Sequence, residues 1–312
     1  AASTYADCKL MIDAAKKLGR KLHIQMSSVM TPQSEKAREY VAEGRIGDPY
    51  LTNLEVFLQR RRPGCDLPDF PQGFLSSKVA GHGQSVDLGV YVIGQILFIL
   101  GSPKVQSVTG FAGQFVGYDK EKITIEGGFD VDDTIDGMVR FENGMSFHYL
   151  NTSANNLKNY MMTYILGTKG ALELTGTDMA GYKFARKDPS DGAGFMGEPE
   201  VIFHEDLGDH VSEVPLNCDA EGMAAVEADP KKMYYYDNQC MWLAYKLGLI
   251  SEEERYNTPE LALNQLLITD GMFLSNEWGR SVTYDEIVEN SPSYYVREQE
   301  INGNMYTYDI TV

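Results

Sequence analysis

Residues 104 to about 205 consist of short apolar stretches separated by turn residues, and this pattern constrains the fold more than any other feature of the sequence. It predicts two hairpins. One is "DGMVRF-ENG-MSFHYL", turned at Asn143-Gly144, and the other is "YMMTYILGTKGALELTG", turned between Gly167 and Gly170. Asn-Gly and glycine-rich turns join antiparallel strands closely. We therefore expect an antiparallel sheet of several strands in the middle of the chain.

Helical patterns precede this region. Thr4 with Asp7 three residues later has the form of a capping box, and the apolar stripe that follows stops at Gly19. The next stretch, "KLHIQM", is predicted to be a short buried strand. Thr31-Pro32 then begins a helix that ends at Gly44, and "YLTNLEVFLQ" is predicted to be a strand.

Further helices are predicted before the sheet in the sequence, at about 85–100, and after it, at about 231–247 and 258–278. Residues 60–80 form a long connection rich in Arg, Pro and Gly, which is either functional or mobile. Residues 187–230 read as loop-rich. The tail "SPSYYVREQEINGNMYTYDITV" has alternating tyrosines and an Asn302-Gly303 turn, which predicts an edge hairpin or an arm. The fold class is therefore α/β, of the α+β kind.

Composition limits the function. The chain has 312 residues, enough for one large or two ordinary domains. Its formal charge of −18 argues against a nucleic acid or an anionic membrane as partner. No stretch approaches the roughly 18 apolar residues of a membrane span. The widely spaced cysteines read as reduced thiols, so we expect a cytoplasmic protein; they are Cys8, Cys65, Cys218 and Cys240.

The motifs that could bind a dinucleotide or a metal lack the surrounding sequence that such sites need. Gly192, Gly194 and Gly197 match G-x-G-x-x-G, but no buried strand precedes them, so they are predicted to be a surface loop. Gly81-x-Gly83 fails because Val86 is not small. The cluster from His204 to His210 does not have helical ligand spacing, and we expect a solvated acidic loop (His204, Glu205, Asp206, His210) and no metal. His23 and His148 lie in predicted strands and read as structural histidines.

The strongest chemical candidate is "AGHGQSVDLGVYVIGQ", residues 80–95. Asp87 and Tyr91 are four residues apart on a predicted helix and so share one face. Gly94 continues that face and leaves room for something else beside it. The alternative is an Asp favoured by the helix dipole and an ordinary half-buried Tyr. Arg60-Arg61-Arg62 is either a solvated charge run or a clamp for anions or hydroxyls.

At these residues the sequence resembles the glucose–fructose oxidoreductase / inositol dehydrogenase (Gfo/Idh/MocA) family. "DLGVYVIGQILFILGSP" after "AGHG" resembles its G-G-G-x-x-x-D-x-G-x-[HY] segment. "AAKKLGRKLHIQM" with "AREYVAEGRIGDPYLTNLEV" resembles the join between its two domains, and "LLITDGMFLSNEWGRSVTYDEI" resembles its C-terminal helix. The three matches occur in family order from residue 4 to about 287.

The resemblance implies a Rossmann domain that holds NAD or NADP, followed by a substrate domain with a large, mostly antiparallel open sheet flanked by helices. Residues 1–27 are then expected to be the last helix and strand of an otherwise missing Rossmann domain. Residues 28–312 are expected to be the substrate-binding and oligomerisation domain, so that the partner is a second copy bound through the open sheet. The family's phosphate loop and its catalytic lysine are not in this sequence. The resemblance therefore implies either a fragment or engineered truncation, or a domain kept for a use other than hydride transfer, and we expect the isolated chain to be inactive without the Rossmann domain.

The resemblance also implies an activity, which is NAD(P)-dependent oxidation of a CH–OH group in a sugar, cyclitol or glycoside. Asp87 and Tyr91 match the family's catalytic positions, and the family's further Asp falls on Gly94 and is absent. A free phenol has a pKa of about 10, so Tyr91 needs a nearby cation to act as a base. His82, Arg60, Arg62 and Lys78 are assigned to the remaining hydroxyls. The alternatives are a binding or assembly domain without cofactor and a redox-neutral lyase or hydrolase.

Overall fold

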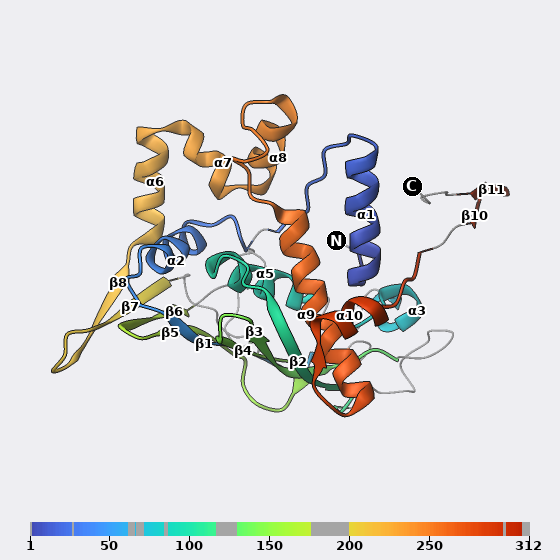
Figure 1. Cartoon of the computed structure of the whole chain (residues 1–312), viewed down its shortest axis with the longest axis horizontal. Coiled ribbons are helices and arrows are strands. Elements are labelled where there is room, and N and C mark those ends of the chain that lie inside the picture. The colour runs from blue at the N-terminus through green and yellow to red at the C-terminus, as the bar shows by residue number, and fades with distance from the viewer. Residues whose placement is uncertain are drawn as a thin grey trace.

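A nine-stranded sheet is the base of the molecule (Figure 1). The computed structural model describes residues 2–26, 28–61, 66, 72–83, 87–116, 130–175, 200–295 and 298–307. The strand order is β8-β7-β6-β5-β1-β4-β3-β2-β9, and only β1 and β4 run parallel among these neighbours. The predicted mostly antiparallel sheet is confirmed. The strands are β1 Pro49–Gln59, β2 Val105–Gly113, β3 Thr134–Phe141, β4 Ser146–Asn155, β5 Tyr160–Gly167, β6 Gly170–Thr175, β7 Glu200–Asp206, β8 Val211–Leu216 and β9 Val282–Thr283.

Both predicted hairpins are present. β3 pairs with β4 in a register that places Arg140 opposite Ser146, and Gly144 in the turn has a φ of +85°, which side chains disfavour. β5 pairs with β6 from Leu166 opposite Ala171. Turn chemistry was therefore sufficient to predict the two hairpins that lie on either side of β1.

The helices gather over one face of the sheet (Figure 1). The buried helix α5 lies between α2 and α9, and α9 packs on β2. A Cβ atom at Gly110 of β2 would lie 2.5 Å from Met272 Cα of α9, so strand and helix backbones are in direct contact. The larger helices are α1 Tyr5–Lys17, α2 Pro32–Ala42, α5 Gly89–Ile99, α6 Cys218–Ala228, α8 Asn238–Leu247, α9 Thr258–Trp278 and α10 Tyr284–Asn290.

The stretch 187–230 was predicted wrongly where it is described. It contains β7, β8 and α6, and His204 to Asp206 lie in a strand of a hairpin and not in a loop. The predicted helix 231–247 is divided into the 3₁₀ turn η3 Pro230–Lys232, α7 Met233–Tyr236 and α8. The division occurs at Asp237, whose extended backbone and side-chain bond to the Cys240 N–H (2.7 Å) cap α8.

The predicted strand "KLHIQM" is also wrong, because residues 20–26 have no regular structure. Their backbone donors bond to side chains instead of a neighbouring strand. Ile24 N donates to Thr258 Oγ1 (3.0 Å) and Met26 N donates to Asn238 Oδ1 (3.2 Å). The segment therefore packs against the N-terminal ends of α8 and α9, where Ile24 and Met26 are buried.

Buried Asp270 joins the beginning and end of the described chain. Its Oδ2 accepts hydrogen bonds from Tyr5 N at the start of α1 (2.9 Å) and from Ser291 Oγ after α10 (2.5 Å). Burial raises the pKa of Asp270 to about 6, and the two hydrogen bonds oppose this rise.

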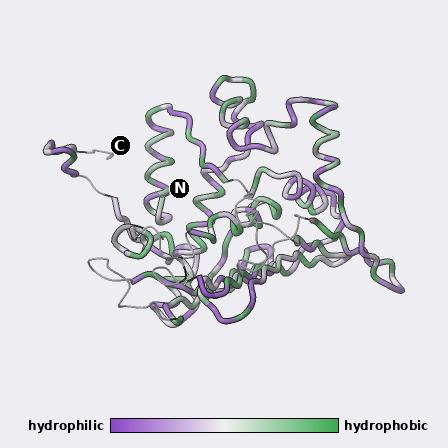
Figure 2. The backbone as a smooth tube through the Cα atoms, turned by 180° about the vertical axis from the view of Figure 1, so that it is seen from behind, coloured by the Kyte–Doolittle hydropathy of each residue, from purple (hydrophilic) through white to green (hydrophobic). Residues whose placement is uncertain are grey.

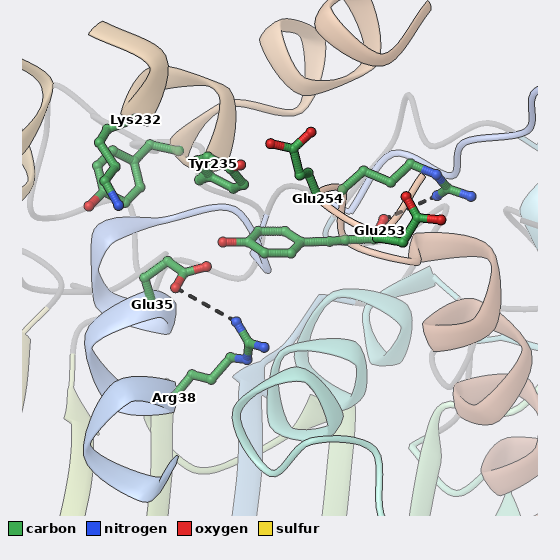
Figure 3. Close-up of a pocket in the computed structure, with 9 residues that line it drawn as sticks. Glu35, Arg38, Lys232, Tyr235, Glu253 and Glu254 are labelled. Carbon is green, nitrogen blue, oxygen red and sulfur yellow. Dashed lines mark hydrogen bonds and ion pairs between the residues drawn. The ribbon is translucent and has the colours of Figure 1, made fainter. Parts of the chain in front are cut away.

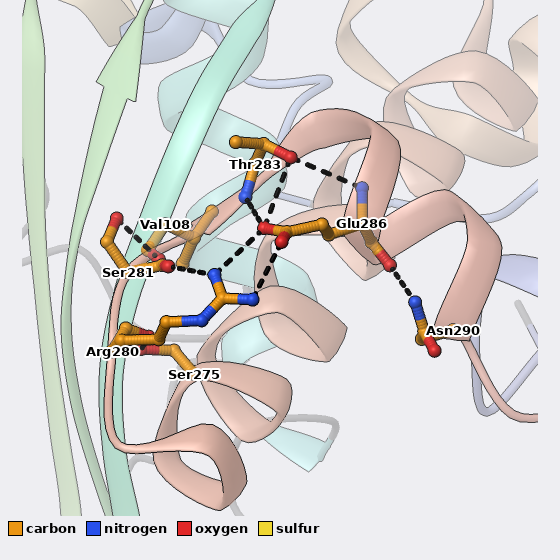
Figure 4. A network of polar contacts seen from close by, with 7 residues as sticks. All are labelled: Val108, Ser275, Arg280, Ser281, Thr283, Glu286 and Asn290. Carbon is orange, nitrogen blue, oxygen red and sulfur yellow. Dashed lines mark hydrogen bonds and ion pairs between the residues drawn. The ribbon is translucent and has the colours of Figure 1, made fainter.

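A polar network fixes the turn from α9 to α10 (Figure 4). Thr283 and Glu286 form a capping box at the start of α10, and Glu286 also pairs with Arg280 (2.7 Å). Ser275 Oγ donates to the Arg280 carbonyl (2.7 Å) and accepts from Gly110 N (2.9 Å). The network therefore ties α10 to the edge of the sheet beside β9.

The tail forms the predicted hairpin, as an arm. β10 Glu298–Ile301 and β11 Asn304–Thr307 make a separate two-stranded sheet, turned at Asn302 and Gly303, which both have positive φ. Figures 1 and 2 show this hairpin standing away from the other elements. In the described part of the chain, no helix has both the length and the hydropathy needed to cross a bilayer.

Candidate functional site

An acidic segment directly before β3 makes hydrogen bonds to three other parts of the chain around the candidate site. Asp130 accepts hydrogen bonds from Ser77 N and Ser77 Oγ (2.6 and 2.7 Å) at the start of α3 Ser77–Ala80, which follows the 3₁₀ turn η1 Gln72–Leu75. Asp132 Oδ1 accepts from Gly83 N (2.7 Å). Buried Asp133 accepts from Phe115 N and Val116 N (2.9 Å each). One short segment therefore positions three separate parts of the chain.

The Gly-His-Gly turn packs tightly against this segment. A Cβ atom at Gly83 would lie 2.1 Å from the Asp132 carbonyl oxygen, so only glycine fits there. His82 stacks on Phe273 of α9, with ring centroids 3.8 Å apart and planes 10° apart. Burial lowers the pKa of His82 to about 4. His82 is therefore a neutral imidazole at pH 7, which can donate or accept a hydrogen bond but carries no charge.

Asp87 follows this turn and is half-buried. Its backbone N–H donates to the Gly83 carbonyl (3.1 Å), which closes a helical turn before α5. Burial raises the pKa of the Asp87 carboxyl, and the positive charge of Arg61 opposes this rise. The site thus contains a carboxyl that holds its proton more tightly than an ordinary Asp and that the charge of Arg61 influences.

Tyr91 lies in the first turn of α5, which begins at Gly89 and not near Ser85 as predicted. Its N–H donates to the carbonyl of Leu88, three residues earlier (3.3 Å), and the α-helix is interrupted at Leu88. The Tyr91 carbonyl accepts a hydrogen bond from Ser28 Oγ. Asp87 therefore precedes the helix that carries Tyr91, and their common face is less regular than the spacing implied.

Gly94 does not leave room for a ligand, which corrects the sequence interpretation. A Cβ atom at Gly94 would lie 2.1 Å from Met26 Cε, so the methionine methyl group already occupies this side of α5. Met26 is buried, and it belongs to the segment that joins α1 to α2.

The predicted basic contacts differ from one another. Arg60 is exposed, has a φ of +51° and pairs with Asp66 (3.4 Å), as in the solvated-loop interpretation. Arg61, and not Arg60, is the residue whose charge acts on Asp87. Arg62 lies outside the described residues, as do Gly192, Gly194 and Gly197. The backbone of Lys78 lies in α3, but its side chain is not among those described.

Several residues of the site were missed by sequence reasoning. Asp130, Asp132 and Asp133 stand together in "FDVDDT" before a predicted strand, and this acidic run was an available signal. Arg61 and Phe273 gave none, because their contacts depend on how distant segments pack.

The remaining histidines have structural partners. Both ring nitrogens of His148 are bonded, to Asn53 Oδ1 (2.6 Å) and Asp136 Oδ1 (2.8 Å). His23 stacks on Trp242, and its Nδ1 bonds to Thr258 Oγ1 (3.2 Å), while Nε2 has no partner. His204 Nε2 contacts Glu173 (3.2 Å). No group of three or more metal-ligating side chains gathers among the described residues.

The N-terminus of α1 does not fit the phosphates of a dinucleotide. Helix α1 is the element that the resemblance assigns to a Rossmann domain, and phosphates bind the free N–H groups of such helices. Here Tyr5 N donates to Asp270 and Ala6 N to Ser291 Oγ (3.0 Å). Asp7 N donates to Thr4 Oγ1 (3.3 Å). The donors are already used, and a buried carboxyl stands where an anion would bind.

Part of the chain is similar to known proteins. Residues 34–173 match the model of the GFO/IDH/MocA C-terminal domain. A stretch of 147 residues, 46% of the chain, is 26% identical to D-glucoside 3-dehydrogenase of Escherichia coli K12 and spans 40% of that enzyme's length. The matched stretch is thus less than half of this curated relative.

Solved structures share the fold. An NAD binding oxidoreductase of Klebsiella pneumoniae matches with a TM-score of 0.67 at 17% identity, over 91% of this chain and 71% of that one. Levoglucosan dehydrogenase in complex with NADH and levoglucosan matches with a TM-score of 0.63 at 20% identity, over the same shares of the two chains. The predicted resemblance is confirmed for residues 34–173, which match the GFO/IDH/MocA C-terminal domain, and the solved structures share the fold of the chain.

Proposed function

We propose that this chain supplies the substrate site of an NAD(P)-dependent oxidoreductase that acts on a CH–OH group of a sugar, cyclitol or glycoside. The observation that carries the proposal is the half-buried Asp87, whose pKa is raised by burial beside the cation Arg61. The relatives support the class of reaction, since one is named for a glucoside and another was solved with levoglucosan and NADH.

Oxidation of a CH–OH group removes a proton from oxygen and a hydride from carbon, leaving a carbonyl. Asp87 is the proposed proton acceptor, because a raised pKa makes its carboxylate a stronger base than an exposed Asp. Arg61 keeps a population of the ionised form. Neutral His82, fixed by its stacking on Phe273, hydrogen-bonds a neighbouring hydroxyl, and Tyr91 orients the reacting one.

The hydride acceptor in this proposal is NAD or NADP, since two of the similar structures are named for NAD or NADH and another is named as a putative NADPH-dependent oxidoreductase. The N-terminus of α1 offers no phosphate site for it, and the proposal assigns this chain the binding of the polyol and the movement of the proton. Residues 1–27 as a Rossmann remnant and 28–312 as the substrate domain remain predictions.

A binding domain without cofactor is the second candidate. The occupied N-terminus of α1 favours it, because that helix end is already satisfied by Asp270 and Ser291. The open face of the sheet, with half-exposed side chains such as Met138, would then serve assembly with a second copy. The molecular mass in solution tests this assembly, and a monomer at micromolar concentration would contradict it.

The activity is tested on this chain joined to the dinucleotide-binding domain that the proposal requires, with NAD⁺ or NADP⁺ and a panel of glycosides and cyclitols, while following the absorbance of the reduced dinucleotide. With the substrate found, we expect Asp87→Asn to lower kcat by about 100-fold or more, as for loss of a general base. We expect Tyr91→Phe to have a smaller effect. The exposed Glu43→Gln is the matched control.

The pH profile separates the roles. In the unchanged protein, kcat should rise with pH through the raised pKa of Asp87, because only the carboxylate accepts a proton. This acid limb should disappear in Asp87→Asn. An Asp87→Asn variant with unchanged kcat and an unchanged acid limb would contradict the role of Asp87. Polyol binding without reduction of either dinucleotide would favour the binding domain.

A further inference from the structure

Figure 3 shows a pocket of about 350 Å³, which lies near the C-terminal end of α5, whereas Asp87 precedes the N-terminal end. The Arg38 guanidinium of α2 covers Phe98, near the end of α5, at 4.9 Å, and Tyr256 packs on the same ring at 4.8 Å. An 11-residue helix is ~16 Å long, so this pocket is separate from the candidate active site. Its lining residues are Glu35, Arg38, Lys232, Tyr235, Tyr236, Glu253, Glu254, Arg255 and Tyr256.

Glu35 has unused hydrogen-bonding capacity in this pocket. Its Oε1 is buried and has no hydrogen-bond partner, although a buried carboxylate oxygen normally has one. The guanidinium of Arg38 approaches Oε2 only to 4.0 Å, which is too long for a hydrogen bond. Burial raises the pKa of Glu35, against the charges of Arg38 and Lys232. A small group that donates a hydrogen bond would satisfy this oxygen.

Arg255, another lining residue, has a hydrogen-bond donor without an acceptor. Its Nη2 pairs with Glu252 and its Nη1 donates to the Tyr256 carbonyl (3.1 Å), but buried Nε has no acceptor. The lining therefore contains a buried acceptor and a buried donor that are both unsatisfied. A hydroxyl group is both donor and acceptor, so a ligand with several hydroxyls can satisfy both kinds of atom.

The charges and rings of the lining narrow the ligand further. Three carboxylates face three cationic side chains, so the lining has no net formal charge and a charged ligand would have no counterion of its own. Three tyrosines contribute aromatic surface, and the rings of Tyr235 and Tyr256 are 5.7 Å apart. Apolar rings with a few convergent polar groups are typical of small-molecule sites.

We propose that this pocket binds a neutral polyol, either a sugar or a cyclitol, at a site separate from Asp87. One hydroxyl donates to the unpartnered Glu35 Oε1, and another accepts from the Arg38 guanidinium, which lies 4.0 Å from Glu35 Oε2. The C–H faces of the ligand pack on Tyr235 and Tyr256. The site is a binding site, and no reaction is assigned to it.

The test is calorimetric titration of the full chain in an Asp87→Asn background, which removes the carboxylate of the candidate active site, and binding at the pocket is identified by its sensitivity to pocket variants. The probes are methyl α-D-glucopyranoside and myo-inositol. We expect at least one probe to bind, and we expect added Glu35→Gln to weaken it by about tenfold, because it removes a hydrogen bond to a charged acceptor. Added Glu43→Gln, at an exposed position after the same helix, should leave the affinity unchanged.

A second variant guards against a folding artefact. Tyr235→Ala removes ring surface and should also weaken the probe, while circular dichroism and the thermal midpoint confirm the fold of each variant. Failure of both probes to bind the Asp87→Asn protein would overturn this proposal and leave the proposed activity intact. Binding that is insensitive to both Glu35→Gln and Tyr235→Ala would overturn it too. Preferential binding of a zwitterion, tested with L-leucine, would overturn the neutral ligand class.

Discussion

The two faces of the sheet are built differently, and β4 shows the contrast within one strand. Phe147 and Tyr149 point under the helices and are completely buried, whereas the alternate residues His148 and Leu150 are half-exposed on the open face. On the covered face, close contact between backbones sets the spacing, as at Gly110 and Met272. On the open face, neighbouring strands are joined by hydrogen bonds between polar side chains, such as that between His148 and Asp136. Packing thus constrains one face and hydrogen bonding the other.

The largest effect is expected where this packing is broken. Gly110→Val should lower the free energy of unfolding by about 3 kcal/mol or more, because its Cβ would lie 2.5 Å from Met272 Cα and α9 would have to move. Thr109→Val, on the exposed face of the same strand, should change it by less than about 0.5 kcal/mol. Urea unfolding followed by circular dichroism measures both. Equal effects would remove the distinction between the faces.

A pH-dependent effect of intermediate size is expected on the helical side, at Asp270. Between its ordinary pKa of 3.8 and the raised value of about 6, the folded state holds a proton that the unfolded chain has released. The free energy of unfolding should therefore fall as pH rises from about 4 to about 6, by at most about 3 kcal/mol. In Asp270→Asn, which can still accept from Tyr5 and Ser291, this fall should be absent. Persistence of the full slope in the variant would assign it to other groups.

The smallest effect is expected on the open face, at His148. Its hydrogen bond to Asp136 raises the pKa of His148 above 6.5, against partial burial. This contribution to stability is complete below pH 6.5 and is lost as pH rises through the folded-state pKa. His148→Gln should remove that loss and change stability by less than about 1 kcal/mol, since both side chains are partly exposed. Thermal midpoints at several pH values would show it, and a change as large as that at Asp270 would contradict the comparison.

Local chemistry in the sequence was enough for part of the fold. The Asn143-Gly144 turn predicted β3 and β4, and the bounds of α9 were correct because Asn257 caps it and Gly279 ends it. Residues 20–26 were predicted wrongly because an apolar run does not reveal whether a strand or a set of side chains will satisfy its backbone. β7 and β8 were missed because polar residues along a half-exposed hairpin resemble a loop.

The candidate site was predictable to a similar extent. The sequence singled out Asp87, Tyr91 and His82, and the structure places the last in a turn connected to Asp87 through Gly83. It did not reveal that Arg61 acts on Asp87 or that Phe273 supports His82. Both contacts join segments that are distant in sequence, and no local pattern encodes them.

The contact between Met26 and Gly94 has a mechanical consequence. A methyl group lies against the bare backbone of α5, and Ser28, two residues further on, bonds to the Tyr91 carbonyl. The segment that leaves α1 and the helix that carries Tyr91 must therefore shift together or lose both contacts. The segment after α1 is therefore coupled to the backbone of α5 at the turn that carries Tyr91.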